Sequence, residues 1–248
     1  MYSQELKTLG FAGHPPTTLL TKAIASGNVR GLQQVPGFDL IGCFTDPSGA
    51  RLGLVRRKGH DVQVTPALAS PETHRATVQR VRDELAHVSV LLSDDESLEL
   101  LALVDDPVRY PLRSEGDPNS FTLIQALALG AVVVRADVYA DEQDFEQHRP
   151  DEDRTWSSRS LASASVAAEG ILSGQDLTPR AFATFTVESA WRRTNELTGE
   201  AFWYGIGLSR VRLVFAMPAT YELEPGNVVA ATCTLTASSG LWDQAEQA

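Results

Sequence analysis

The chain has 248 residues, of which 43% are hydrophobic and 21% are charged, and its formal net charge is −11 at pH 7. These values are typical of a globular protein and exclude wholesale disorder, collagen and a small disulfide scaffold. Because 21 basic residues face 32 acidic ones, the protein repels phosphate backbones, and we expect no nucleic acid among its partners. The longest near-apolar stretch, residues 123–134, is shorter than the roughly 20 residues of a membrane-spanning helix, so we expect no membrane partner.

The sequence favours a cytoplasmic protein without a cofactor. Its first residues lack the basic start and the continuous apolar run of a secretory signal. Cys43 and Cys233 lie in apolar runs, which predicts a buried thiol at each position. No glycine-rich run ends in Lys-Ser or Lys-Thr, so the motif of a phosphate-binding loop is absent.

The first part of the chain predicts a helix followed by a hairpin. The helix is expected over residues 17–34. The hairpin is expected over residues 38–57, because Asp-Pro-Ser-Gly at residues 46–49 places proline and glycine where a tight turn needs them. A short third strand is expected over residues 60–65.

The strongest helix pattern covers residues 71–92. Ser70 stands at the position of a helix cap and Pro71 at the first helical position. Apolar residues then recur at alternating steps of three and four, which is the spacing of one helix face. They are Val78, Val81, Leu85, Val88 and Leu92. Residues 97–104 fit a helix and a strand equally well.

The second half predicts helices followed by a long antiparallel sheet. Residues 120–129 predict a helix that ends at Gly130, and residues 131–140 predict a strand. Another helix is expected over the Ala- and Ser-rich residues 157–173. Three long strand patterns follow, over residues 181–193, 201–217 and 228–237.

These patterns predict an α+β fold, with a β-hairpin and a helix layer in the N-terminal half. In the C-terminal half they predict an antiparallel β-meander packed with helices. The Pro- and charge-rich residues 105–120 are the expected boundary. We therefore expect an N-terminal α/β subdomain over residues 1–110 and a C-terminal helix plus antiparallel sheet over residues 111–248, with a single domain as the alternative.

Side chains alternate between the two faces of a strand, so the strand patterns also predict which residues are buried. The expected inward positions are Phe185, Val187, Trp191, Phe202 and Tyr204. Trp203 is expected to point outward together with Arg192. The apolar phase changes at Ser209-Arg210, which predicts a bulge, a bend or a strand break there.

A basic corner on the first hairpin is the first candidate binding site. It consists of Arg51, Arg56, Arg57 and Lys58. Because arginine offers a planar fork of donors, such a corner can hold a phosphate or a carboxylate. Solvated charges also collect at hairpin ends, and that remains the alternative.

The second candidate site, the aromatic-Arg hairpin, consists of Trp191, Arg192, Arg193 and Trp203. Aromatic rings beside arginines at the end of a sheet suit ligand stacking or a protein interface. Core packing is the alternative, since tryptophan is common in cores as well.

Two carboxylates are candidates for a pocket. Asp137 and Glu188 lie on predicted polar sheet faces, and burial in a pocket would raise the pKa of either group and suit it to acid–base chemistry. A solvated sheet face is the alternative. The acidic residues 141–153 attract attention as a cation site, but we predict no metal there, because the carboxylates are spread over a strand end, a helical turn and a loop.

No motif of nucleophilic catalysis is present: the chain has no Gly-x-Ser-x-Gly, no paired Cys motif and no His-Glu-x-x-His. The first hypothesis is therefore a non-enzymatic binding or assembly protein that acts through its C-terminal sheet and the aromatic-Arg hairpin. Its partner would be another protein or a second copy in a homo-oligomer, because long antiparallel strands offer an edge for pairing.

The second hypothesis is a small-molecule enzyme or binding protein with a pocket between a helix and the curved C-terminal sheet. Residues 215–229 (FAMPATYELEPGNVV) resemble the final hairpin of the hot-dog thioesterases and dehydratases. This resemblance implies a hot-dog-like enzyme, although the run carries no catalytic residue of that family.

Overall fold

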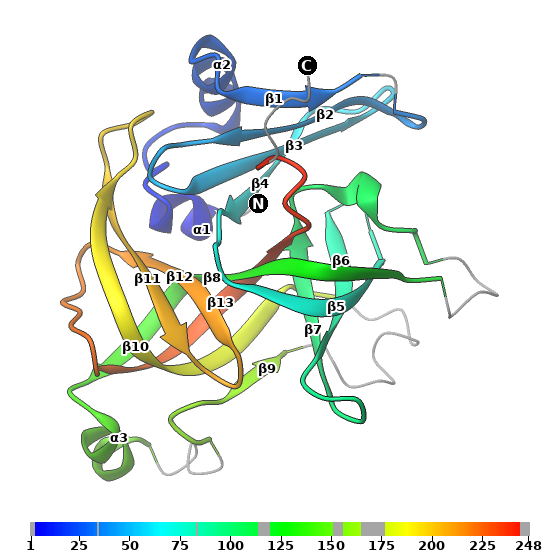
Figure 1. The fold of residues 1–248 in the computed structure, drawn as a ribbon. Coiled ribbons are helices and arrows are strands. Elements are labelled where there is room, and N and C mark those ends of the chain that lie inside the picture. Colours follow the sequence, from blue (N-terminus) through cyan, green and yellow to red (C-terminus); the bar gives the residue numbers. More distant parts are fainter. Residues whose placement is uncertain are drawn as a thin grey trace.

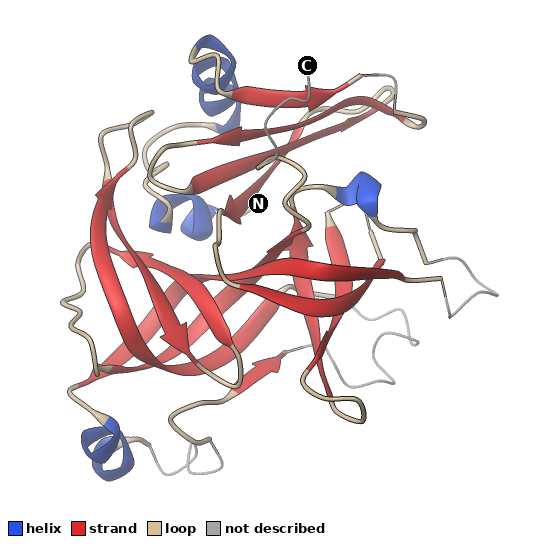
Figure 2. Cartoon of the chain, in the orientation of Figure 1, coloured by secondary structure: helices blue, strands red, loops and turns tan. Residues whose placement is uncertain are grey.

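The computed structural model describes residues 3–33, 35–82, 84–113, 120–150, 156–164 and 177–243. Within these residues the fold is mostly β, with a four-stranded antiparallel sheet and a nine-stranded mixed sheet. Figures 1 and 2 show the smaller sheet lying against one side of the larger sheet, with helix α1 between them. None of the described helices is long and apolar enough to cross a membrane. The helical elements are α1 (Ser3–Thr8), α2 (Pro16–Ala25), the 3-10 turn η1 (Pro107–Arg109) and α3 (Glu142–His148).

The four-stranded sheet contains the predicted first hairpin, which the structure confirms. In its turn Gly49 adopts a φ of +90°, and the Asp46 carboxylate accepts a hydrogen bond from the Ser48 amide at 2.9 Å. The helix expected over residues 17–34 is shorter, because Gly27 at a φ of +74° turns the chain into an edge strand. The strands, in order across the sheet, are β1 (Val29–Leu32), β2 (Phe38–Thr45), β3 (Ala50–Arg57) and β4 (Gln63–Leu68).

The nine-stranded sheet closes on itself twice. Its strand order is β11-β12-β8-β5-β6-β7-β13-β10-β9, and β8 also pairs with β13 while β10 also pairs with β11. Strands β8, β13, β10, β11 and β12 therefore form one closed ring, and β8, β13, β7, β6 and β5 form a second. One apolar cluster, the ring core, fills both. The strands are β5 (Thr73–Arg80), β6 (Leu85–Leu91), β7 (Ser97–Val104), β8 (Thr122–Tyr139), β9 (Leu161–Ser163), β10 (Arg180–Thr194), β11 (Ala201–Leu208), β12 (Arg212–Pro218) and β13 (Val228–Ser238).

The helix predicted over residues 71–92 is wrong, because this segment forms the antiparallel strands β5 and β6. Val78 and Val88 are fully buried in the ring core, as the period of a strand requires. Leu85 instead faces the opposite side of the sheet, in a separate small apolar cluster. The three- and four-residue spacing thus combined residues from both faces of two strands with Val81 and Leu92, which lie just beyond the strand ends.

The helix predicted over residues 120–129 is also wrong, because β8 runs through this segment without interruption. Gly130, expected to end that helix, lies inside β8, where a Cβ would come within 2.8 Å of the Thr236 hydroxyl. Close packing against β13, and not a helix end, requires glycine at this position. Of the helix predicted over residues 157–173, Leu161–Ser163 form strand β9, and residues 165–176 lie outside the described residues.

The three long C-terminal strand patterns are confirmed, as is the hairpin between the first two. The phase change at Ser209-Arg210 is a strand break, which separates β11 from β12. The sequence did not reveal a second phase change, a β-bulge between Val187 and Ser189. The inward face is reversed beyond this bulge, so Trp191 is 47% exposed although Phe185 is fully buried.

Ring closure occupies the strand edges of the C-terminal meander. β11 pairs with β10 on one side and with β12 on the other. β12 then continues the ring through a parallel pairing with β8. Both β11 and β12 therefore have a neighbouring strand on each side within the chain, whereas β10 pairs with β13 only as far as Thr186.

Strand pairing crosses the boundary that the sequence suggests near residue 110, because β5 pairs with β8 and β7 pairs with β13. Residues 215–229, which resemble the hot-dog hairpin, form the end of β12, a loop and the start of β13. These two strands do not pair with each other, since β8 lies between them. The segment is therefore not a hairpin.

A second apolar cluster, the inter-sheet cluster, holds the small sheet against the first ring. Its members come from α1, α2, the small sheet and the outer faces of β8, β11 and β12. They include the buried side chains of Leu9, Leu19, Phe44, Leu52 and Phe202. Burying such side chains stabilises the fold by about 1.5–3 kcal/mol each before the loss of chain entropy is counted.

Candidate functional site

A cleft with a volume of about 770 Å³ lies between α1, β4 and the large sheet. Its walls also include the turn between β5 and β6 and the first residue of β10. Glu5, Thr65 and Thr234 are buried and form the floor, whereas Arg82 and Arg180 are exposed and form the rim. A cleft of this volume is large enough for a small-molecule ligand.

Helix α1 fixes Glu5 over the outer face of the β8–β13 ladder. Leu9, next to the end of the helix, enters the inter-sheet cluster, and the Thr8 hydroxyl donates a hydrogen bond to the Val133 carbonyl at 2.8 Å. As a result Glu5 is only 4% exposed. The Thr234 hydroxyl of β13 donates a hydrogen bond to the Glu5 Oε1 at 2.9 Å.

The negative charge of Glu5 is only partly compensated by nearby groups. Arg180 Nη2 lies 4.0 Å from Glu5 Oε1, which is beyond hydrogen-bond distance. The Arg180 side chain is 46% exposed, so water screens much of its charge. Because a buried carboxylate is costly without strong donors or a close cation, a positive group that enters the cleft would stabilise Glu5.

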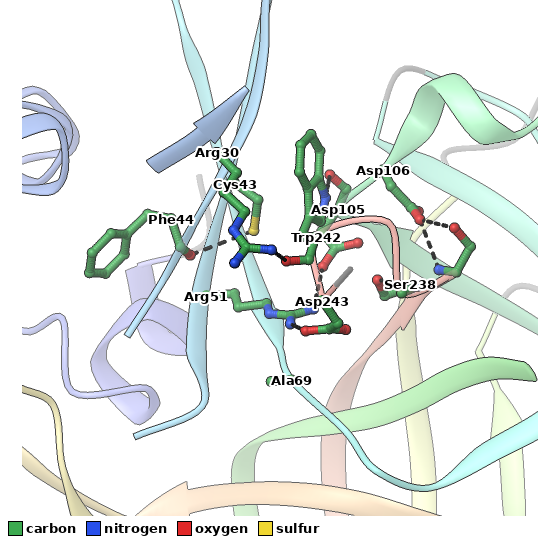
Figure 3. Close-up of polar contacts among 12 residues, drawn as sticks. Arg30, Cys43, Phe44, Arg51, Ala69, Asp105, Asp106, Ser238, Trp242 and Asp243 are labelled. Carbon is green, nitrogen blue, oxygen red and sulfur yellow. Dashed lines mark hydrogen bonds and ion pairs between the residues drawn. The ribbon is translucent and has the colours of Figure 1, made fainter. Parts of the chain in front are cut away.

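The second group of charges, called here the buried charge cluster, consists of the buried Arg51, Asp105 and Asp106 and the half-exposed Asp243 (Figure 3). Arg51 lies on the face of the small sheet opposite the inter-sheet cluster. Arg51 Nη1 lies 3.2 Å from Asp105 Oδ2, and Arg51 Nη2 forms an ion pair with Asp243. Asp106 accepts hydrogen bonds from the amide and the hydroxyl of Ser239. The side chains of Arg51 and Asp105 are at most 1% exposed.

The buried charge cluster anchors the segment that follows β13. Trp242 packs against Ile41 and Cys43 on the face of the small sheet. Its indole Nε1 donates a hydrogen bond to the Asp105 carbonyl at 2.9 Å, and its own carbonyl accepts one from Arg30 at 2.7 Å. The same segment borders a second, smaller cavity of about 410 Å³.

Burial changes the proton affinity of the buried charge cluster. Burial and the adjacent Asp106 carboxylate raise the pKa of Asp105 to about 7, against the opposing effect of Arg51. Burial also raises the pKa of Asp106, against its hydrogen bonds from Ser239. Burial alone would lower the pKa of Arg51, but Asp105 raises it above its usual value, so Arg51 stays charged. Shifts of this kind occur at active sites and at structural ion networks. Asp105 and Asp106 line neither of the two cavities, which favours a structural role for this pair, whereas Asp243 lines the smaller cavity.

The structure divides the predicted basic corner. Arg51 is separated from the rest of the corner, because it is buried at the turn end of β3 under the segments that carry Asp105 and Trp242. The other members lie at the opposite end of the hairpin and are exposed. They are Arg56, Arg57 and Lys58. Anion binding by these three residues stays a prediction.

The aromatic-Arg hairpin presents Trp191 and Arg192 to solvent. Trp191 pairs with Tyr204 across the hairpin, and their ring centroids are 6.4 Å apart. The Arg193 guanidinium lies 3.7 Å from the centre of the Tyr204 ring, and it donates a hydrogen bond to the Ser48 carbonyl at 2.9 Å. Arg193 therefore fastens the hairpin to the small sheet.

The outward orientation expected for Trp203 is wrong. Trp203 is partly buried against the ring core, and its indole Nε1 donates a hydrogen bond to the Tyr221 carbonyl at 2.8 Å. Phe202 and Tyr204 are buried as expected, but they face the inter-sheet cluster. Both faces of β11 are thus covered, one by the ring interior and one by the small sheet, and sequence alternation alone does not reveal this.

Asp137 and Glu188 are both exposed, and neither lines one of the two cavities. Glu188 lies at the β-bulge of β10, where its carboxylate is 2.8 Å from the Arg212 guanidinium. The structure therefore gives neither carboxylate the buried environment that acid–base chemistry would need.

The acidic segment begins with helix α3. The Asp141 side chain accepts a hydrogen bond from the Asp144 amide at 2.8 Å and caps the helix, and Asp144 Oδ1 lies 2.7 Å from His148 Nδ1. Among the described residues, no three His, Cys, Asp or Glu side chains form a group that could hold a metal ion. Residues 151–155 lie outside the described part.

Sequence reasoning missed the residues that matter most in the two sites. Glu5 and Thr234 meet although 229 positions separate them. The only sequence signal was the row of threonines on one face of β13, since a polar outer face requires a polar or solvated neighbour. Asp105 and Asp106 open the Pro- and charge-rich stretch that the sequence suggests as a boundary, yet both are buried.

Comparison with known proteins adds no family assignment. No protein-family model matches the chain, no curated protein matches it, and no solved structure matches its fold.

Proposed function

We propose that the protein binds a small polar molecule in the cleft between α1, β4 and strands β10 and β13. One observation carries this proposal: Glu5 lines the cleft at 4% exposure, with the Thr234 hydroxyl as its one hydrogen-bond donor among the described side chains. A carboxylate in such a place is costly in the empty protein. A ligand that donates hydrogen bonds to the Glu5 carboxylate would stabilise its charge, so we assign Glu5 to ligand recognition.

Non-covalent binding fits the cleft better than catalysis does. The described residues that line it include no histidine and no cysteine. Its two buried hydroxyls are already engaged: Thr234 donates to Glu5, and Thr65 donates to the Gly53 carbonyl. An activated hydroxyl nucleophile needs a base that accepts its proton and a group that orients the base, and the described lining offers no such arrangement.

The proposal is tested by filling the cleft. Gln63 is an exposed residue of β4 on the cleft wall, so Gln63→Trp adds bulk there without altering Glu5. Gln147→Trp, on the exposed side of α3, is the matched control. The wild type and the two variants are each expressed in the cell from which the protein originates. Each is then isolated under non-denaturing conditions and analysed by native mass spectrometry.

The expected result is a bound small molecule on the wild-type chain and on Gln147→Trp, and its loss from Gln63→Trp. A wild-type chain isolated without any bound small molecule would count against the proposal. So would a bound molecule that Gln63→Trp retains in full.

A second candidate function, binding of a protein partner through the aromatic-Arg hairpin, is favoured by the exposure of Trp191. This side chain is 47% exposed and stands beside the exposed Arg192. Because the pair combines an aromatic surface with positive charge, the partner it suits is an acidic protein segment. Trp191→Ala and Arg192→Glu should each weaken capture of such a partner, and light scattering would reveal self-association instead.

We also propose a cytoplasmic location. Cys43 and Cys233 are free and buried, which supports a reducing compartment. Fractionation of the source cell, followed by immunodetection of the chain, tests this location directly.

A further inference from the structure

We infer that the ligand of the cleft is a zwitterion of the amino-acid type, whose protonated amine pairs with Glu5 and whose acidic group pairs with the arginines at the rim. The inference rests on the proposed function and names its ligand class. It follows from the placement of charge in the cleft: Glu5 is buried, whereas Arg82, Arg180 and the half-buried Glu84 lie closer to solvent.

The buried Glu5 carboxylate favours a positively charged hydrogen-bond donor on the ligand. Glu5 Oε1 accepts a hydrogen bond from Thr234 at 2.9 Å, and the carboxylate is held by a helix that is itself packed and hydrogen-bonded. A protonated amine has three donors and a full positive charge, so it can reach both the carboxylate and a neighbouring hydroxyl oxygen. An anion at the same depth would meet the Glu5 charge at close range and would be repelled.

Arg82 and Arg180 favour an acidic group at the other end of the ligand. Arg180 is exposed at 46% of its side-chain surface, and Arg82 is exposed and held in place by a hydrogen bond to the Leu177 carbonyl. Both residues line the cleft, and although Arg180 lies 4.0 Å from Glu5 and Arg82 bonds to Leu177, each exposed guanidinium has further N–H donors for a carboxylate that enters from solvent. Arginine recognises such a group with paired, nearly parallel hydrogen bonds.

The balance of charge supports a ligand without net charge. Among the described lining residues, the acidic side chains are Glu5 and Glu84, and the basic ones are Arg82 and Arg180. A cleft with equal numbers of each sign favours neither a simple cation nor a simple anion. Its volume of about 770 Å³ exceeds the need of the smallest amino acids, so a larger amino acid or a dipeptide fits the space better.

The test uses defined probes and charge-neutral variants. The twenty L-amino acids and a set of dipeptides are screened by thermal shift, and each compound that binds is measured by calorimetry. Its N-acetyl derivative lacks the amine charge, and its C-terminal amide lacks the acidic charge. The variants are Glu5→Gln and Arg180→Gln, and Arg210→Gln is the control, because Arg210 pairs with Glu96 and does not line the cleft.

We expect at least one zwitterion to bind, with an affinity reduced about tenfold or more by N-acetylation and by Glu5→Gln. Amidation and Arg180→Gln should reduce it less, by about threefold, because the rim is exposed to solvent. The N-acetyl derivative should bind wild type and Glu5→Gln equally, since its amine no longer pairs with the carboxylate. Arg210→Gln should behave as wild type, and circular dichroism confirms that each variant is folded.

Two results would overturn the inference: no amino acid or dipeptide binds, or one binds with an affinity that Glu5→Gln leaves unchanged. These results are distinguishable from failure of the proposed function. If native mass spectrometry finds a bound molecule that is not a zwitterion and that Gln63→Trp removes, the cleft is a binding site for another ligand class. If it finds no bound molecule at all, both proposals fail.

Discussion

Raising the pH from 5 to 7 should destabilise the protein, because Asp105 is buried in the charge cluster. Burial holds its pKa at about 7 in the folded chain, against an ordinary value of 3.8. Between these two values the folded state binds one proton more than the unfolded state, so the free energy of unfolding falls as the pH rises. The stability from this group is fully present below pH 3.8 and is lost once the pH passes about 7.

The size of the effect follows from the proton difference. One additional proton in the folded state corresponds to about 1.4 kcal/mol per pH unit. The interval from pH 5 to pH 7 therefore removes up to about 3 kcal/mol. For a chain of this length that corresponds to a fall in Tm of about 6–12 °C. The pKa of Asp106 is raised as well, so its contribution has the same sign.

Urea unfolding of the wild-type chain at pH 5, 6, 7 and 8 measures this directly. Asp105→Asn cannot ionise and should show a much smaller slope, whereas Asp61→Asn, an exposed control, should follow the wild type. Stability that is constant or rising between pH 5 and 7 would refute the reasoning. An Asp105→Asn chain with the wild-type slope would show that another group is responsible.

Three further predictions test the fold around the sites. Gly205→Ala should lower the free energy of unfolding measured with urea by about 1–3 kcal/mol, since the new Cβ would lie 2.4 Å from the Phe215 ring. Trp203→Ala should lower the free energy of unfolding by about 3 kcal/mol, because the Trp203 ring is packed against the ring core. Trp191→Ala should lower it by less than about 1 kcal/mol, because Trp191 is 47% exposed. Equal losses for the two variants would contradict this difference in burial. Both cysteines are buried with raised pKa values, so neither should react with a thiol reagent at pH 8 until the chain is unfolded.

The strands of the C-terminal half were predictable because their alternation extends over many residues. A period of two repeated through a long segment cannot be confused with a helix. The tight turn at residues 46–49 was equally predictable, since proline and glycine have few conformational alternatives there. Both signals depend only on neighbouring residues, and the structure contains the strands and the turn that they predict.

The two wrong helices show where a local signal is ambiguous. In residues 71–92 the strands are short and both faces are partly covered, so apolar residues occur on both faces and can imitate a helical spacing. In residues 120–129 the strand is buried on both faces only from Leu127 onward, and exposed apolar side chains such as Phe121 and Leu123 precede it, so the apolar residues show no clear period of two. A bulge adds a third difficulty, because one extra residue before Ser189 reverses the faces of everything that follows.

The candidate sites were not predictable, because they form where remote segments meet. Arg51 and Arg57 belong to the same strand and to the same face of it, yet Arg51 is buried and Arg57 is exposed. The difference comes from Asp105 and Trp242, which cover one end of the small sheet and leave the other end open to solvent. A charged side chain is stable in the interior only beside its partners, so whether it is buried depends on the segments that supply those partners. The same reasoning applies to Glu5, whose donor comes from the other end of the chain. A single sequence indicates which face of a strand a charged residue occupies, but the segment that covers that face decides whether the residue is solvated, paired or available to a ligand.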